Sequence, residues 1–190
     1  GSDALDTLTT GDANTAVGRF AGTAVTTAIG VTAVGYQALD ANTTGNYNVA
    51  IGFDCLSANT TAVNNTGVGT NALVANTTGA ENTGIGRSAL ESNTTASNNT
   101  AVGRKCLQST TTGHSNTAMG ETAAQNVTGT GNTAIGREAM QLGTGGEDNV
   151  AIGYQALQDN AGDNSVGIGR NSLKQCTTGG GNTAVGQMTG

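Results

Sequence analysis

One glycine recurs along almost the whole chain at a nearly constant spacing. It first appears as Gly18 and returns every 17 residues, with a step of 16 at two places, through to Gly186. A fixed period of this length is the sequence signature of a solenoid or another repeat array. Each repeat contacts only its neighbours in such an array, so the pattern within one repeat determines most of the fold.

The repeat reads N-T-A-V-G-x-x-A-L-x-x-N-T-T-G-x-x, and we number its positions from one to seventeen, so that Asn99 to Ser115 form one copy. Position two is Thr or Val, position three is Ala or Gly, and position four is aliphatic, which is typical of a short strand. Stacked in register, these strands form one parallel sheet with a spacing of about 4.8 Å. We expect Val102, at position four, to point into the coil and the small residue at position three to lie on the opposite face.

Positions six to eleven are rich in helix formers, as in Tyr36-Gln37-Ala38-Leu39. This favours a single α-helical or 3₁₀ turn in each coil, with a second short strand as the alternative. The leucine at position nine, such as Leu39, is expected to fill the coil interior opposite position four. The predicted fold class is therefore all-β: a parallel β-solenoid or β-roll of about eleven coils and about 17 residues per coil.

The remaining positions indicate turns and polar ladders. Asn-Thr-Thr-Gly, as in residues 42–45, suits a turn followed by a short extended piece. Position one is Asn in nine of eleven repeats, and stacked Asn side chains can form an amide ladder between coils. The two repeats of 16 residues flank a glycine-rich one, so residues 143–148 and 159–163 are predicted to form bulges or protruding loops.

Composition limits what this array can contain and contact. With 3% aromatic residues and no Trp, the chain cannot build a thick core. The net charge of −6 argues against nucleic acid or an anionic membrane as partner, and no apolar run approaches the ~18 residues of a membrane span. Residues 1–2 look like a cloning scar, and residues 3–190 read as one array excised from a longer repeat region.

The expected quaternary structure follows from the thin core. Two large aliphatic side chains per coil bury too little apolar surface to offset the entropy of ordering a whole coil. We therefore expect a homotrimer, in which the small residues of position three or their neighbours are buried against other chains. A self-sufficient monomeric solenoid is the alternative.

The repeat also resembles known families. Asn14-Thr-Ala-Val-Gly18 and Asn149-Val-Ala-Ile-Gly153 resemble the S-V-A-I-G-type repeats of trimeric autotransporter adhesin heads, and Tyr154-Gln155-Ala156-Leu157 is still closer to the N-T-A-V-G-Y-Q-A-L arrays of phage tail fibres and bacterial surface proteins. The resemblance covers residues 4–190. It implies a trimeric left-handed β-roll, outside a cell or on a virion, that serves adhesion to a host-surface glycan or protein. The period of 17 departs from the ~14-residue coil of the adhesin heads.

No catalytic, cofactor-binding or metal-binding residue is assigned. His114 is the only histidine and is expected to be a solvated turn residue rather than a metal ligand. Cys55 and Cys106 lie in the small apolar column at position eight, three coils or about 14 Å apart, too far for a disulfide. We expect both to be buried free thiols, Cys176 to be more exposed, and a Cys106–His114 nucleophilic pair to be absent because no acid is near to orient it.

Positions six and seven vary most and are predicted to face outward as a ridge. The alternative to a binding ridge is a solubilising rim, in which Arg104, Glu121 and Arg137 pair across adjacent coils. Tyr36 and Phe53 lie on successive coils, so their rings either form an aromatic platform about 5 Å apart or cover the seam with a neighbouring chain. The candidate ligand-binding ridge comprises Tyr36, Phe53, Arg87, Arg104, Arg137, Tyr154 and Arg170.

The sequence thus predicts a non-enzymatic structural and display module of an extracellular fibre or adhesin. The alternative is an ice-binding solenoid, indicated by two columns of threonine that begin at Thr43 and Thr44. Adjacent strand residues point to opposite faces, so these two columns share one flat surface only if the turn rotates them.

Overall fold

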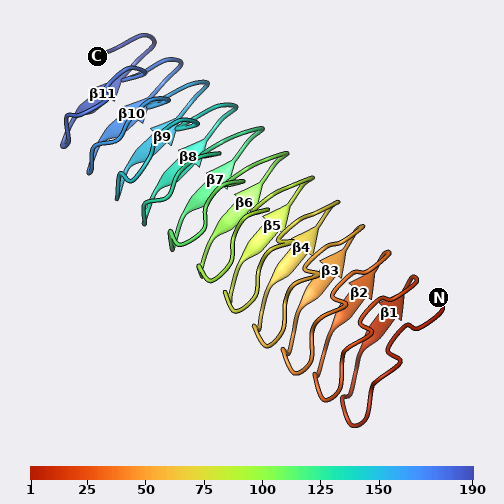
Figure 1. Ribbon diagram of the computed structural model, residues 1–190. Helices are drawn as coiled ribbons and strands as arrows, with labels where there is room; N and C mark the ends of the chain where they lie inside the picture. The colour runs from red at the N-terminus through yellow and green to blue at the C-terminus, as the bar shows by residue number, and fades with distance from the viewer.

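The computed structural model describes all 190 residues as a single solenoid whose coils stack along one axis (Figure 1). Each coil contributes one three-residue strand, and the eleven strands form one sheet in sequential order with every pair parallel. The strands are β1 Thr15–Val17, β2 Thr32–Val34, β3 Val49–Ile51, β4 Thr66–Val68, β5 Thr83–Ile85, β6 Thr100–Val102, β7 Thr117–Met119, β8 Thr133–Ile135, β9 Val150–Ile152, β10 Val166–Ile168 and β11 Thr183–Val185. The predicted parallel β-solenoid is confirmed, and we number each coil by its strand.

The register is the one expected from the repeat. Thr100 pairs with Thr117, and the step of 16 residues still pairs Thr117 with Thr133. The missing residue of a short coil therefore comes out of a turn and not out of the sheet. The segments 143–148 and 159–163 are each bonded to a neighbouring coil, since Asp148 N–H donates to Thr130 O and Asp159 N–H to Lys174 O, both at 3.1 Å. The backbone bond between threonines of successive coils, such as Thr60 N–H to Thr77 O, is absent from both segments. Bulges or protruding loops there stay a prediction.

The side chains of the strand point to the opposite faces of the sheet from those expected. Position three is inside: Ala101 is fully buried, whereas Val102 on the same strand is only partly buried and points outward. The prediction that position four fills the coil was therefore wrong, as was the expectation that the small residues face other chains. The reason is lack of space, because a Cβ on Gly67 would come within 2.6 Å of Cys55 Sγ and 3.3 Å of Leu56 Cδ1.

Position nine supplies the large core side chains, as predicted. Leu39, Leu107 and their equivalents are fully buried and pack with the alanines of positions three and eight in one continuous cluster along the solenoid. Because Leu at position nine already fills the space under the sheet, only Ala or Gly fits at position three. The bulky β-branched residues must then project from the other face.

No helical turn forms in any coil. Position nine has a positive φ, such as +49° at Leu107, and position seven does as well, such as +57° at Lys105. These left-handed conformations break a right-handed helix, and the N–H of Leu107 donates to Ala123 O of the next coil at 3.1 Å instead of to its own turn. None of the chain therefore forms a helix that could span a membrane.

The glycine at position five is required for two reasons. At Gly103 φ is +139°, outside the region that side chains with a Cβ readily adopt. A Cβ there would also lie 2.4 Å from the carbonyl oxygen of Gly120, its equivalent in the next coil. The periodic glycine therefore marks a point where consecutive coils approach each other closely.

Asparagine side chains occupy the part of the interior that the aliphatic side chains do not fill. At position one, Asn99 Oδ1 accepts from the backbone N–H of Asn116 at 2.9 Å, and Asn99 Nδ2 donates to Gly113 O in its own coil at 2.9 Å. The predicted ladder at this position is thus mainly a side chain-to-backbone ladder. A continuous amide ladder forms instead at position twelve, where the Nδ2 of each residue donates to the Oδ1 of the previous one through Asn42, Asn59, Asn76 and Asn93.

Candidate binding ridge and outer sheet face

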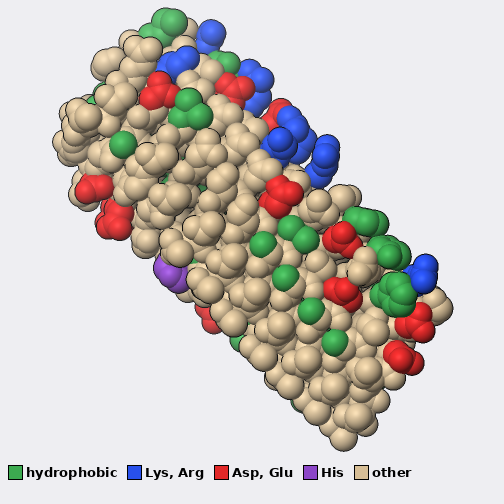
Figure 2. All heavy atoms as spheres, viewed as in Figure 1, with side chains coloured by type: hydrophobic (Ala, Val, Ile, Leu, Met, Phe, Trp, Pro, Cys, Tyr) green, Lys and Arg blue, Asp and Glu red, His purple; other side chains and the backbone are tan.

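The position-six side chains project from the turn that follows each strand and form the expected outward ridge. Phe53, Arg87, Arg104 and Arg137 are exposed, and Tyr36 is 38% exposed. In Figure 2 the Lys and Arg side chains gather along one long edge of the molecule, and bulky hydrophobic side chains continue that edge towards the N-terminal end.

The aromatic platform is confirmed. The rings of Tyr36 and Phe53 stack with centroids 5.3 Å apart and an interplanar angle of 12°. Phe20, at position seven of the first coil, adds an edge-to-face contact with Tyr36 at 6.0 Å. The sequence reasoning left Phe20 out of the platform, although its place one coil before Tyr36 was a visible signal.

The third aromatic of the ridge lies apart from this platform. Tyr154 belongs to coil nine, and its ring lies between two guanidinium groups, with Arg137 Cζ 4.7 Å and Arg170 Cζ 5.9 Å from the centroid. Such contacts hold the ring and the cations in place along the ridge. The candidate residues therefore form an aromatic patch in coils two and three and a mixed cationic patch from coil five onward.

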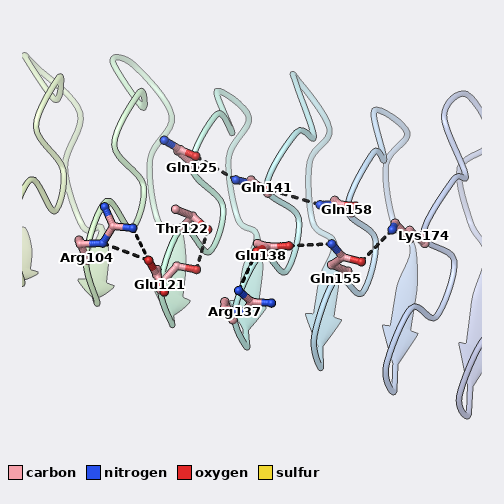
Figure 3. Close-up of polar contacts among 10 residues, drawn as sticks. All are labelled: Arg104, Glu121, Thr122, Gln125, Arg137, Glu138, Gln141, Gln155, Gln158 and Lys174. Atoms are coloured by element: carbon pink, nitrogen blue, oxygen red, sulfur yellow. Dashed lines mark hydrogen bonds and ion pairs between the residues drawn. The ribbon is translucent and has the colours of Figure 1, made fainter.

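Ion pairs along the ridge follow the prediction only in part. Arg104 and Glu121 pair across adjacent coils (Figure 3), and the hydrogen bond from the guanidinium lowers the pKa of Glu121. Arg137, by contrast, pairs with Glu138 of its own coil at 3.3 Å. Arg87 takes part in no ion pair.

A glutamine ladder at position ten was missed by the sequence reasoning. The Nε2 of Gln125 donates to Gln108 Oε1 at 2.7 Å, and the chain of bonds continues through Gln141 and Gln158 (Figure 3). Gln108 Nε2 also bonds to the carboxylate of Glu91, which extends the ladder by one coil. Four Gln residues at one position of consecutive coils were the available signal.

The histidine and the three cysteines lie where the repeat positions predicted. His114 is exposed, and its Nδ1 accepts from the backbone N–H of Ser97 at 3.0 Å. Cys55 and Cys106 are fully buried free thiols, and burial raises the pKa of each to about 12. A buried thiol with so high a pKa is protonated near neutrality, which disfavours Cys106 as a nucleophile. Cys176 is partly exposed, and no group of His, Cys, Asp and Glu side chains could hold a metal ion.

The outer face of the sheet is the other notable surface, and it follows from the phase of the strands. Positions two and four of every strand point outward, while the buried residue between them is Ala or Gly. Ile51, Met119 and Ile135 are 39%, 50% and 38% exposed, which is unusual for large aliphatic side chains in regular strands. This outer sheet face carries only Thr, Val, Ile and Met at its two columns, so it contains no charge.

The two threonine columns of the turn do not form such a face. Thr43 Oγ1 donates to Thr60 O at 3.1 Å, and the same bond links Thr77 to Thr94 at 3.0 Å, so the first column is partly buried and its hydroxyls are used between coils. Thr44, in the second column, is exposed. The exposed hydroxyls of the turn therefore form a single column.

The surface has no pocket. Comparison of the chain with protein-family models, with curated proteins and with solved structures found no match.

Proposed function

We propose that this chain is a structural and display module of an extracellular fibre or adhesin, such as a phage tail fibre or a trimeric surface adhesin, and that it performs no catalysis. The observation that carries the proposal is the continuity of bonding from coil to coil. Strand pairing, the position-one and position-twelve asparagines and the position-thirteen threonines each link a coil to the next. Such a rod is stiff along its axis and holds its ridge side chains at a fixed spacing.

The ridge is the part of this module that would contact a host surface. The stacked pair of Tyr36 and Phe53 offers a rigid aromatic surface at low entropic cost, which suits a glycan or a protein receptor. The experiment compares the binding of the wild-type protein and of the double variant Tyr36→Ser/Phe53→Ser to glycan arrays and to intact cells. Loss of binding with unchanged circular dichroism supports display by the ridge, whereas unchanged binding excludes the platform as a contact surface.

The homotrimer belongs to the same proposal. Native mass spectrometry at micromolar concentration tests it, and a stable monomer would contradict it. The expected location of such a module is a virion or the outer surface of a bacterium.

A second candidate function is ice binding, and a specific observation favours it. The outer sheet face aligns Thr and Val or Ile in two uncharged columns with the regular spacing of strands, about 4.8 Å between coils and about 7 Å along each strand. Those repeats are close to oxygen spacings in the ice lattice. Thermal hysteresis of the purified protein tests this function, and its loss in a Thr66→Tyr/Thr100→Tyr variant would locate the activity on this face.

A further inference from the structure

The outer sheet face lies between two edges of opposite charge. One edge is the ridge, where all Lys and Arg residues except Lys174 occupy position six or seven. The other edge consists of the two residues immediately before position one, and we call it the acidic edge. Its charged members are Asp12, Glu81, Glu147, Asp148 and Asp163. Although the net charge of the chain is −6, most of its cations lie on one side of an apolar strip, and these five acids lie on the other side.

An acid on the acidic edge faces a cation on the ridge in three of the eleven coils. In coil one Asp12 precedes the strand and Arg19 follows it, in coil five Glu81 and Arg87 do so, and in coil ten Asp163 and Arg170. All six side chains are exposed, and none belongs to either ion pair of the chain. The strand and its flanking residues separate the two members of each set, and they do not pair within one molecule.

The three matched coils lie near both ends and near the middle of the chain, so the arrangement is not confined to one end. Other charged coils lack a counterpart: coils six and eight carry cations on the ridge with no acid opposite, and coil nine carries Glu147 and Asp148 opposite uncharged residues.

A second copy of the chain is the partner that fits this pattern. Rotation about an axis along the solenoid places the ridge of one copy beside the acidic edge of the next at the same coil. An antiparallel pair would instead place the ridge against itself, with Arg104 and Lys105 of both copies meeting at the central coil, which costs free energy through like-charge repulsion.

The area is also sufficient. Eleven strands at about 4.8 Å give a strip about 50 Å long, and with both edges it is roughly 15 Å wide, close to the ~800 Å² per partner of a stable interface. Only a surface with the same period can match every coil of this strip, because a mismatch in spacing accumulates along eleven coils.

We propose that the outer sheet face is the contact surface between copies of this chain, which pack parallel and in register so that the ridge of each copy pairs with the acidic edge of the next. The apolar columns, with Val102 and Met119 near the middle, then lie at the centre of the assembly and the ion pairs at its rim. The inference rests on the proposed role as a fibre module and identifies the surface that would assemble it.

Charge reversal tests the pairing. Glu81→Lys and Arg87→Glu, each alone, are expected to raise the dissociation constant about tenfold in sedimentation velocity at low salt, and the double variant is expected to return close to wild type. Glu147→Lys is the matched control, since it lies on the same edge but faces the uncharged Tyr154 and Gln155 of its coil. Additive weakening in the double variant, or no change in either single variant, overturns the pairing.

Cysteine cross-linking tests the orientation. In a Cys176→Ser background, Thr32→Cys chains are expected to cross-link to each other through a short bis-maleimide, because coil two meets coil two. Thr44→Cys, exposed but off the face, is the control and should not cross-link. Cross-linking of Thr32→Cys only to Val166→Cys chains would show an antiparallel assembly and overturn the inference.

The outcomes separate this inference from the proposed function. An oligomer without these cross-links overturns the interface and leaves the fibre role standing. A protein that stays monomeric at all concentrations overturns both, and thermal hysteresis of that monomer would mean that ice covers the face.

Discussion

The amide ladder at position twelve gives the sharpest test of what holds the coils together. Asn76 is fully buried; its Nδ2 donates to Asn59 Oδ1 at 3.1 Å and to Gly79 O at 2.9 Å, and its Oδ1 accepts from Asn93 Nδ2 at 2.8 Å. Asn76→Ala removes three hydrogen bonds, each worth about 1 kcal/mol.

The loss of unfolding free energy in Asn76→Ala also depends on whether the former hydrogen-bond partners of Asn76 keep another partner. Gly79 O keeps the Nδ2 of Asn65 at 2.9 Å, and Asn93 Nδ2 keeps Ala96 O at 3.1 Å, but Asn59 Oδ1 loses its donor. A buried acceptor without a partner costs a further ~1–3 kcal/mol. We therefore expect Asn76→Ala to lower the free energy of unfolding by about 4–6 kcal/mol, measured by urea denaturation followed by circular dichroism at one protein concentration.

Two further variants make the comparison specific. Thr78→Ala, in the same coil, truncates an exposed side chain without hydrogen bonds and should change stability by less than about 0.5 kcal/mol. Asn93→Ala should cost less than Asn76→Ala, because Asn93 Oδ1 already has no partner. Equal stabilities of the Asn76→Ala and Thr78→Ala variants would refute the view that this ladder supports the interior.

Other consequences of the structure can be checked separately. Gly103→Ala should destabilise the protein by at least about 3 kcal/mol in the same urea titration, since it combines a φ of +139° with a clash against the next coil, and stability like that of wild type would contradict the close approach. Only Cys176 should react with a thiol reagent at pH 8, with Cys55 and Cys106 reacting after denaturation, because their pKa values are raised to about 12; three rapid reactions in the folded protein would disprove their burial. Val102→Asp should lower the stability of a single chain by less than about 1 kcal/mol while it abolishes self-association in native mass spectrometry, and a large loss of stability in the monomer would place Val102 inside after all.

Some features of the candidate binding ridge could be predicted from the sequence, and others are seen only in the structure. The stacking of Tyr36 on Phe53 followed from their equal positions in successive repeats, and so did the Arg104–Glu121 pair. The pairing of Arg137 with Glu138 of its own coil did not follow, because repeat positions alone do not decide between this adjacent residue and Glu121 of the previous coil.

The sequence by itself determined the period, the parallel in-register sheet, the glycine corner and the buried leucine column. Each of these features follows from one residue type that recurs at one repeat position. Identical coils stack with least strain when equivalent residues of successive coils lie next to each other. Gly103 and Leu107 illustrate this, because their places in the structure are those that the repeat assigns to them.

Only the tertiary structure decided which way the strands face and how the chain turns after them. A strand that reads Thr-Ala-Val presents apolar groups on both faces, so its alternation is equally compatible with either phase. The space under the sheet, already filled by Leu107 and Cys106, admits Ala101 and forces Val102 outward. Likewise, positions seven and nine take left-handed conformations in which their N–H groups bond to neighbouring coils, as Lys105 does to Arg87 O and Leu107 to Ala123 O; these partners exist only once the solenoid has formed.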